Sequence, residues 1–346
     1  MQARGLIIPA PGRVELRDYD VPDPGPGQIL IEAEYSTLSP GTERNIIMGV
    51  SRPLPCAIGY SMAGRVRAIG PGVTRWRVGD GCVTTGRHAT LLLADERFVT
   101  PVPEGTDLEQ AAFFNLAHTA AYGVRQSRLQ LGEAVVVLGQ GLVGLLTARV
   151  AQLAGGLPVI AVDLDEDRLA LSRRLGIHEV VNGADHARLA ALVKALPWGG
   201  APVVIECTGA RRPVEQALEL VAVRGRVVLL STTHGDETVP YNRPLTMKGA
   251  SLIGAYINSK PWSLAQTDVV MPDWPPSLAA GERAYFGGDP WTSDEDVRMV
   301  MNLIRYGSLD LRPLVTHRFT PDEAPAAYQL VVQQDRRLVG AVIRWK

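Results

Sequence analysis

The chain has 346 residues, of which 46% are hydrophobic and 21% charged, and its formal net charge is −1. This length suits two domains, and the near-zero charge excludes an electrostatic reason to bind nucleic acid or an anionic membrane. The three cysteines, Cys56, Cys82 and Cys207, are far apart, which argues against a disulfide framework and a zinc ribbon. The longest apolar region, over 134–162, is broken by glycines and by Arg149, so we expect no membrane span and a soluble, cytoplasmic protein.

The first 122 residues are typical of a β-rich domain, because short apolar strands alternate with turns. The segment VELRDYDVPDPGPGQILIEAEY carries a Pro/Gly cluster at 22–27, which predicts a strand, a turn and a second strand. The segments GRVRAIGPGV, GDGCVTTG and FVTPVPEG continue this pattern. We therefore expect residues 1–122 to form mainly β structure.

Residues 123–257 change to strands that alternate with helices. The expected strands are apolar runs rich in β-branched residues: AVVVLG, PVIAVD, EVVNG, APVVIECTG, GRVVLL and ASLIGA. The helical segments between them are LVGLLTARVAQLAG, EDRLALSRRLG, ADHARLAALVKAL and PVEQALELVAV. Continuous buried strands separated by amphipathic helices indicate a parallel sheet covered on both faces, and six of them match the doubly wound dinucleotide-binding (Rossmann) fold.

The expected strand AVVVLG runs directly into a glycine-rich turn and then a helix. Gly139 suits the tight turn, Gly141 lets the backbone approach a pyrophosphate, and Gly144 lets helix and strand pack closely. The free N–H groups at the start of the helix then face the phosphates. The alternative is a Rossmann domain that binds nothing, or binds another nucleotide.

The next expected strand ends in Asp163, whose carboxylate can accept hydrogen bonds from the adenosine ribose and would repel a 2′-phosphate. This favours NAD over NADP. The acidic residues 165–167 suit the first turn of the following helix, where they complement the helix dipole, and we interpret them as structural. Arg168 is either a solvated helix charge or a flank of the adenosine ribose.

Residues 258–346 return to mixed structure. A helix is expected near 293–306 and a strand near 338–345. The aromatic, Pro-rich segment 257–291 precedes them. Its aromatic residues are Trp262, Trp274, Tyr285, Phe286 and Trp291. Such a long loop is usually functional, so it forms either a lid or wall of a substrate pocket, with polar contacts from Asn258 and Lys260, or a contact between subunits.

In the order of its segments and in its motifs, the chain resembles the medium-chain dehydrogenase/reductase superfamily over essentially its whole length. The matching motifs are VPDPGPGQILIE, SPGTE, PCAIGYSMAGRVRAIGPGV, RVGD, GQGLVG, CTGA and RPLVTHRFTPDEAPAAYQLV. The resemblance implies an α/β fold in which a Rossmann NAD-binding domain (123–257) is inserted into a β-rich GroES-like catalytic domain (1–122 and 258–346). It also implies that Asp163 and Arg168 hold the adenosine ribose. The cofactor site that it implies comprises Gly139, Gly141, Leu142, Val143, Gly144, Asp163, Arg168 and Thr208.

The chain departs from the family at the zinc sites. Members with a catalytic zinc carry a Cys before a Thr/Ser-Asp pair, then a Gly-His-Glu, and later a Cys or acidic ligand before the Rossmann domain. The corresponding stretches here are PGTE (40–43), GYS (59–61) and LAHT (116–119). A zinc site needs about three N, S or carboxylate ligands, and Glu43 and His118 alone are too few. The four-cysteine structural lobe retains only Cys82, so we expect no zinc of either kind.

Hydride transfer without zinc still requires a group that takes the alcohol proton or stabilises the oxyanion. Tyr60 stands at the lost His position, so its phenol either hydrogen-bonds the reacting oxygen or only fills the vacated volume. Thr42 matches the hydroxyl of the family's proton relay, or it caps a helix that begins near Glu43. Glu43 is the acidic partner of that hydroxyl or a surface carboxylate. His118 is a proton shuttle or a satisfied core histidine.

We therefore expect a zinc-independent, NAD(H)-dependent oxidoreductase that interconverts a secondary alcohol and its ketone. By family analogy the substrate is polar: a polyol, a sugar or a related biosynthetic intermediate. The alternatives are a zinc-free quinone or enoyl reductase, which commonly favours NADPH, and a non-catalytic NAD-binding protein. A redox-neutral use of bound NAD, as in epimerisation, also stays open. The expected partners are the small-molecule substrate and further copies of the chain in a homodimer or homotetramer.

Overall fold

The computed structural model describes residues 1–231, 241–259, 262 and 292–346. The chain divides into two compact units. Unit 1 comprises Met1–Leu116 and Asp294–Lys346, and unit 2 comprises Ala117–Ser293. The limits expected from the sequence (1–122, 123–257 and 258–346) differ from this division, since residues 117–122 and 258–293 fall in unit 2. The limits of domains that fold on their own stay a prediction.

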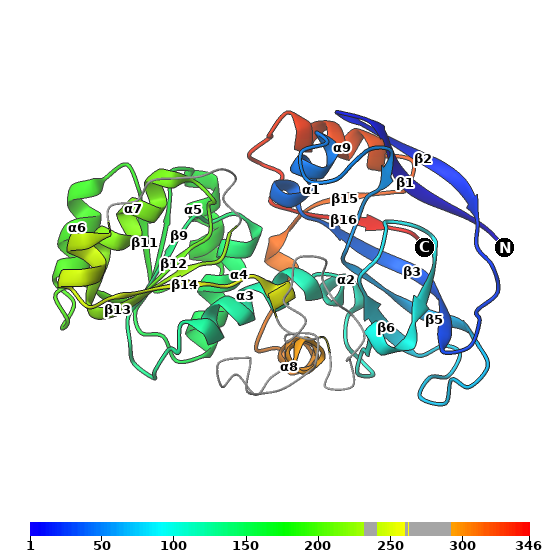
Figure 1. Ribbon diagram of the computed structural model, residues 1–346, viewed down its shortest axis with the longest axis horizontal. Helices are drawn as coiled ribbons and strands as arrows, with labels where there is room; N and C mark the ends of the chain where they lie inside the picture. The colour runs from blue at the N-terminus through cyan, green and yellow to red at the C-terminus, as the bar shows by residue number, and fades with distance from the viewer. Residues whose placement is uncertain (232–240, 260–261, 263–291) are drawn as a thin grey trace. The chain divides into compact units, whose positions relative to one another are not determined.

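Unit 2 is built on a six-stranded parallel sheet in the order β11-β10-β9-β12-β13-β14. Its strands are β9 (Val135–Leu138), β10 (Val159–Asp163), β11 (Glu179–Asn182), β12 (Ala201–Glu206), β13 (Val221–Leu229) and β14 (Ser251–Gly254). The connecting helices are α4 (Leu142–Leu153), α5 (Glu166–Arg174), α6 (His186–Lys194) and α7 (Arg211–Leu220). Figure 1 shows these helices flanking the sheet. The predicted doubly wound fold is confirmed.

The strands of this sheet are apolar because helices cover both faces. All four residues of β9 are buried, as are the first four of β10. At the start of α5 the side chain of Asp165 accepts hydrogen bonds from the backbone N–H groups of Asp167 and Arg168. The prediction that residues 165–167 form a structural, acidic first turn is therefore confirmed.

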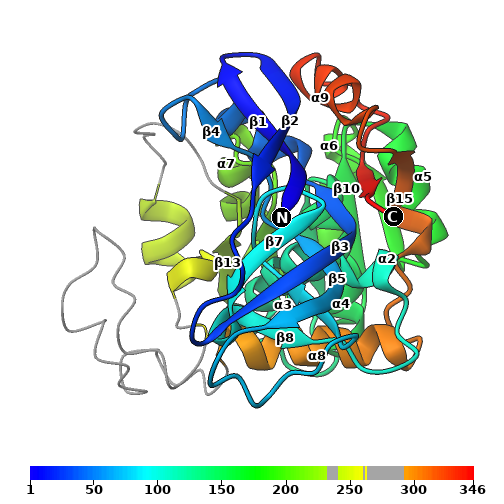
Figure 2. The ribbon, with the colours of Figure 1, turned by 90° about the vertical axis from the view of Figure 1, so that its right-hand side faces the viewer.

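Unit 1 contains two sheets. The larger has the order β15-β16-β3-β5-β6-β8, with β7 also paired to β3, and the smaller has the order β2-β1-β4. The strands of the larger sheet are β3 (Gln28–Leu38), β5 (Met62–Ile69), β6 (Gly81–Thr84), β7 (Leu91–Asp95), β8 (Val99–Pro101), β15 (Val315–Phe319) and β16 (Gly340–Arg344). Those of the smaller sheet are β1 (Gln2–Ala10), β2 (Arg13–Asp20) and β4 (Cys56–Ala57). Figure 2 shows the long strand β3 running alongside β5 and β7.

The expected strand–turn–strand near Pro22–Gly27 is present as β2 and β3, but the two strands lie in different sheets. β2 pairs with β1, whereas β3 pairs with β5, β7 and β16. The stretch after β8 is helical instead of β-structured, because its apolar residues recur at helical spacing. Its helices are α2 (Leu108–Ala111) and α3 (Phe114–Gln126).

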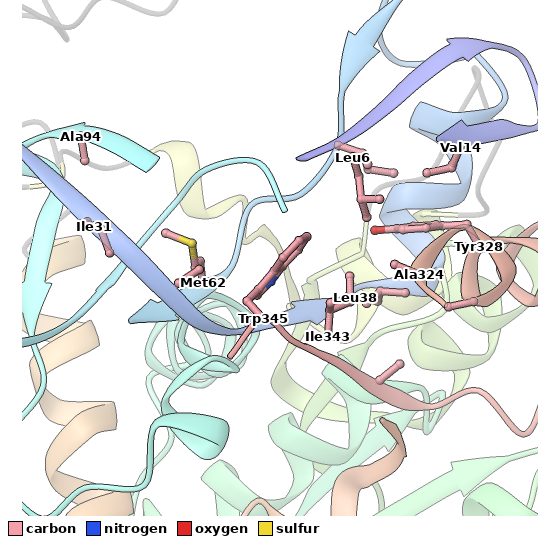
Figure 3. Close-up of a cluster of buried hydrophobic side chains, with 14 of the residues drawn as sticks. Leu6, Val14, Ile31, Leu38, Met62, Ala94, Ala324, Tyr328, Ile343 and Trp345 are labelled. Atoms are coloured by element: carbon pink, nitrogen blue, oxygen red, sulfur yellow. The ribbon is translucent and has the colours of Figure 1, made fainter. Parts of the chain in front are cut away.

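Most of α3 belongs to unit 2, whereas α2 belongs to unit 1. The remaining helices, which lie in unit 1 apart from Ser293, are α1 (Pro40–Ile47), α8 (Ser293–Arg305) and α9 (Ala324–Val332). Short helical segments are η1 (Glu96–Phe98), η2 (Asn242–Met247), η3 (Ile257–Ser259) and η6 (Arg312–Leu314). Figure 3 shows the core of unit 1, in which Tyr328 of α9 and Trp345 after β16 pack with residues of β1, β3 and β5. Within the described part of the chain, no helix is long and apolar enough to cross a membrane.

Candidate functional site

The glycine-rich loop between β9 and α4 has three different local environments. Gly139 has a φ of +89°, which favours glycine, and a Cβ there would lie 2.6 Å from the Thr208 methyl carbon. A Cβ at Gly144 would lie 1.8 Å from the Gly139 carbonyl oxygen, so α4 packs on the loop only through a glycine. At Gly141, the residue that precedes α4, a Cβ would meet no atom within 4 Å. These environments suit the turn, close packing and cofactor approach that the sequence analysis assigns to the three glycines.

The carboxylate of Asp163 is fixed beside this loop. Its Oδ2 accepts a hydrogen bond from the backbone N–H of Gln140 at 2.5 Å, and its Oδ1 accepts one from the N–H of Asp165 at 2.9 Å. Arg168 Nη1 lies 3.9 Å from Asp163 Oδ2. Arg168 therefore lies within ion-pair distance of Asp163, and its contact with the adenosine ribose stays a prediction. Leu142 and Val143 form the first residues of α4, where backbone N–H groups are available to an anion.

A residue that the sequence analysis did not single out, Glu206, organises the neighbouring loop after β12. Its buried carboxylate accepts hydrogen bonds from the Thr208 N–H at 2.6 Å, the Ser231 hydroxyl at 2.6 Å and the Thr208 hydroxyl. These bonds fix Thr208 with its methyl group against Gly139. The signal in the sequence is an acidic residue at the end of an otherwise apolar strand.

In unit 1 the structure brings Thr42 and Tyr60 together. Tyr60 is half-buried in the loop between β4 and β5, and the hydroxyls of Ser39 and Thr42 are near enough to its phenol to lower its pKa as hydrogen-bond donors. The backbone carbonyl of Tyr60 accepts a hydrogen bond from the Asn115 amide at 3.0 Å. The exposed Thr42 lies within the first turn of α1, whose N-cap residue is Ser39. The alternative that Thr42 caps a helix beginning near Glu43 is therefore wrong, because Pro40 already starts the helix.

The environment of Tyr60 keeps its phenol protonated. Burial raises the pKa of Tyr60 above its ordinary value of 10.0, and the negative charge of Glu43 raises it further. The hydrogen bonds from Ser39 and Thr42 lower this pKa, but they do not offset the other two effects. Tyr60 is therefore a hydrogen-bond donor and proton donor, and a poor base.

Glu43 is fully buried, so the alternative of a surface carboxylate is wrong. Its Oε1 lies 3.2 Å from His88 Nε2, and its Oε2 accepts a hydrogen bond from the Tyr328 hydroxyl at 2.7 Å. The sequence analysis singled out neither His88 nor Tyr328. Tyr328 is 285 residues from Glu43 along the chain, so no local pattern connects the two.

His118 lies on α3, is 2% exposed and belongs to unit 2, whereas Thr42, Glu43 and Tyr60 belong to unit 1. Its role in proton transfer stays a prediction. Tyr122, one turn further along α3, has its hydroxyl 2.9 Å from the Ser259 hydroxyl of η3. Of the aromatic segment 257–291, residues 260–261 and 263–291, including Lys260, Trp274 and Trp291, lie outside the described residues.

The side chains at the family's ligand positions do not fit a catalytic zinc. Pro40 has no donor atom, Leu116 is apolar, and Tyr60 is a protonated phenol. Glu43 has both carboxylate oxygens engaged by His88 and Tyr328. A zinc site needs about three N, S or carboxylate ligands, so the chemistry of these positions supports the expectation of no zinc, which stays a prediction.

Comparison with known proteins gives matches over both units. Residues 25–104 match the family model of the alcohol dehydrogenase GroES-like domain, and residues 143–269 match that of zinc-binding dehydrogenases. An alcohol dehydrogenase of Cupriavidus necator is 25% identical over 384 residues, with 96% of this chain and 95% of the relative covered. An L-threonine 3-dehydrogenase of Pyrococcus horikoshii is 25% identical over 353 residues, with 92% and 91% covered.

Solved structures share the fold. A zinc-binding dehydrogenase from Sinorhizobium meliloti bound to NADP superposes with a TM-score of 0.80 at 19% identity, over 100% of both chains. An alcohol dehydrogenase from Escherichia coli complexed with NADH has a TM-score of 0.80 at 16% identity, over 99% of each chain. At these identities the likeness establishes the architecture, and it leaves the chemistry to the site residues.

Proposed function

Because the chain belongs to the medium-chain dehydrogenase/reductase superfamily, we propose that it is an NAD(H)-dependent oxidoreductase that interconverts a secondary alcohol and its ketone. The observation that carries the proposal is the β9–α4 loop, where Gly139, Gly141 and Gly144 have the environments that a dinucleotide needs. The relatives, an alcohol dehydrogenase and an L-threonine 3-dehydrogenase, support the reaction class. By family analogy the proposed substrate is polar, such as a polyol, a sugar or a related intermediate.

The preference for NAD(H) rests on Asp163. Its fixed carboxylate can accept hydrogen bonds from the adenosine ribose, whereas a 2′-phosphate would meet its negative charge. Arg168 beside it completes the acidic–basic pair that the family resemblance implies. When bound, the nicotinamide supplies the hydride for ketone reduction and accepts it in alcohol oxidation.

We assign the proton to Tyr60 and propose that the reaction is independent of zinc. During ketone reduction, negative charge develops on the carbonyl oxygen as the carbon–oxygen π bond breaks. The Tyr60 hydroxyl donates its proton to that oxygen, and the new O–H bond completes the alcohol. Thr42, which is exposed and near the Tyr60 phenol, returns a proton from water to the phenolate. Alcohol oxidation follows the same path in reverse.

Steady-state kinetics and metal analysis test this proposal together. The full-length protein is treated with a chelator and assayed for oxidation of NADH and of NADPH, once with a panel of polar ketones and once with quinones and enones. We expect turnover of a ketone with NADH, less than one bound zinc per ten chains, and no loss of activity after chelation. Turnover confined to quinones or enones with NADPH would establish that the protein is a quinone or enoyl reductase. Tight NADH binding without any turnover would establish that it is a non-catalytic NAD-binding protein. About one tightly bound zinc per chain would contradict zinc independence.

A further inference from the structure

Five buried residues form a connected polar group in unit 1, which we name the Glu43 cluster. Its members are Ser36, Glu43, His88, Tyr328 and Trp345. They come from β3, α1, the loop between β6 and β7, α9 and the segment after β16. None of them takes part in the proton transfer described above. We propose that His88, acting through Glu43 and Gly59, positions the Thr42–Tyr60 pair, a role that rests on the proposed function.

The hydrogen bonds of the cluster follow from the chemistry of its members. The Trp345 indole N–H can only donate, and it lies 2.8 Å from Ser36 Oγ, so Ser36 accepts. Ser36 Oγ also lies 2.7 Å from His88 Nδ1, within hydrogen-bond distance. The other ring nitrogen of His88, Nε2, lies 3.2 Å from Glu43 Oε1, so a proton on Nε2 can be donated to the carboxylate. With Tyr328 donating to Oε2, every polar group of the cluster has a partner.

Glu43 needs these partners because it is a fully buried carboxylate. An unpaired charge in such a place is costly, so His88 and Tyr328 together hold both its oxygens and thereby the first turn of α1. Thr42 is the residue immediately before Glu43 in that turn. His88 and Tyr328 thus contact the Glu43 carboxylate, and the negative charge of Glu43 also acts on the neutral phenol of Tyr60.

His88 also fixes the loop that carries Tyr60. Gly59 has a φ of +114°, and a Cβ there would lie 2.5 Å from the His88 backbone nitrogen and 2.6 Å from its ring carbon Cδ2. The His88 N–H donates to the Ile58 carbonyl at 2.8 Å, and its own carbonyl accepts from Leu6 at 2.9 Å. His88 therefore fixes the backbone that precedes Tyr60. Through Glu43 it also fixes the helical turn that contains Thr42.

The competing explanation is that the cluster only stabilises unit 1. A double-mutant cycle separates the two, because a positioning residue loses its effect on turnover once the group that it positions is gone. The variants are Tyr328→Phe, His88→Leu and His88→Gln, each in the wild type and in a Tyr60→Phe background. The control is Tyr19→Phe, which removes a tyrosine hydroxyl in unit 1 that donates to the Leu91 carbonyl instead of to Glu43.

In the wild-type background we expect kcat to fall about tenfold for Tyr328→Phe and about 100-fold for His88→Leu, because a misplacement of about 1 Å costs that much. His88→Gln should recover most of the loss, since its amide can donate to Glu43. The KM for NADH of these variants should stay within about twofold of the wild-type value, and so should the kcat of the Tyr19→Phe control. In the Tyr60→Phe background the loss from Tyr328→Phe should shrink to less than about twofold.

Equal losses in both backgrounds, or a folded His88→Leu protein with wild-type kcat, would overturn the proposal. If His88→Leu fails to fold, Tyr328→Phe and His88→Gln still decide the cycle. Crystal structures of the wild type and of Tyr328→Phe give a readout that needs no turnover. Displacement of Tyr60 relative to Thr42 supports the positioning role, and an unchanged pair contradicts it. Failure of the proposed function is recognised separately, by Tyr60→Phe alone keeping full turnover or by a wild type that reduces no ketone.

Discussion

The protonation state of Tyr60 decides how each direction of the reaction depends on pH. Ketone reduction requires the protonated phenol, and burial together with the charge of Glu43 raises the pKa of Tyr60 above 10.0. We therefore expect kcat for reduction to stay level up to about pH 10, while kcat for oxidation, which requires the deprotonated phenol, rises with pH over the same range. Glu43→Gln removes the nearby negative charge and lowers the Tyr60 pKa, so reduction should decline at a lower pH than in the wild type. Full pH profiles in both directions measure this, and a wild-type reduction rate that already falls between pH 7 and 9 would contradict it.

The choice of cofactor is a second property of single residues. Asp163→Ser removes the carboxylate that would repel a 2′-phosphate, and we expect the NADH-over-NADPH ratio of kcat/KM to fall by about tenfold or more. Asp167→Ser is the matched control, because Asp167 is an exposed acid four residues further along, in the first turn of α5. Its ratio should match that of the wild type. A wild type that already prefers NADPH would refute the assignment of Asp163 to the ribose.

Which site residues the sequence predicts depends on how local their contacts are. Gly139, Gly144 and Asp163 follow a strand–loop–helix–strand pattern, so their places are predictable from spacing alone. His88 and Tyr328 meet Glu43 across 45 and 285 residues, and a lone histidine or tyrosine in an apolar segment carries no sign of such a partner. Thr42 was predictable only through the family resemblance, and its alternative role as a helix cap failed because Pro40 begins α1 earlier than expected.

At the level of elements, two glycine substitutions in the loop between β9 and α4 distinguish helix packing from cofactor binding. Gly144→Ala places a Cβ 1.8 Å from the Gly139 carbonyl, so α4 must shift, and we expect a loss of about 1–3 kcal/mol in stability together with weaker NADH binding. Gly141→Ala meets no atom within 4 Å and should unfold at the wild-type temperature. Its added methyl group should nevertheless raise the Kd for NADH at least about tenfold, by keeping the pyrophosphate from the backbone. Thermal unfolding and NADH fluorescence titration measure both properties. Wild-type NADH affinity in Gly141→Ala would place the cofactor elsewhere.

The elements of unit 2 were predictable because each strand is a continuous apolar run and each helix between the strands is amphipathic. The pairing in unit 1 was not. β2 and β3 are joined by a Pro/Gly turn, a pattern typical of two neighbouring strands, yet they belong to different sheets. The partners of β3, which are β16, β5 and β7, are selected by packing in three dimensions, and strand periodicity contains no information on which distant strand is paired.

Over the whole molecule, the C-terminal residues complete a unit that the N-terminal residues begin. β16 lies between β15 and β3, and its residues Ala341, Val342 and Ile343 are fully buried. A chain that ends at Val339 should therefore lose cooperative folding of unit 1, while the continuous chain of unit 2 keeps its parallel sheet. Removal of Lys346 alone is the control, since its exposed ion pair with Glu32 is worth about 0–1 kcal/mol. Hydrogen exchange followed by mass spectrometry measures both, and slow exchange in β3 of the truncated chain would contradict the expectation.

The insertion of unit 2 into unit 1 was predictable from the order of the segment types along the chain. β-rich segments at both ends flank one block of alternating strands and helices, and the structure joins residues 1–116 with 294–346. Where each domain begins and ends stays a prediction. The homodimer or homotetramer expected from the family stays a prediction, which light scattering on the purified protein measures.

The central claim is that a phenol takes the place of a zinc ion, and Tyr60→Phe tests it most directly. The substitution keeps the ring and its packing and removes only the oxygen that donates to the substrate. On the ketone that the chelator-treated wild type reduces fastest with NADH, we predict a loss of about 10²–10³ in kcat, because one preorganised donor typically contributes that much. Thermal stability and the Kd for NADH should stay close to those of the wild type. Near-wild-type turnover of Tyr60→Phe would contradict the claim and shift the proton-handling role to His118 and Thr42.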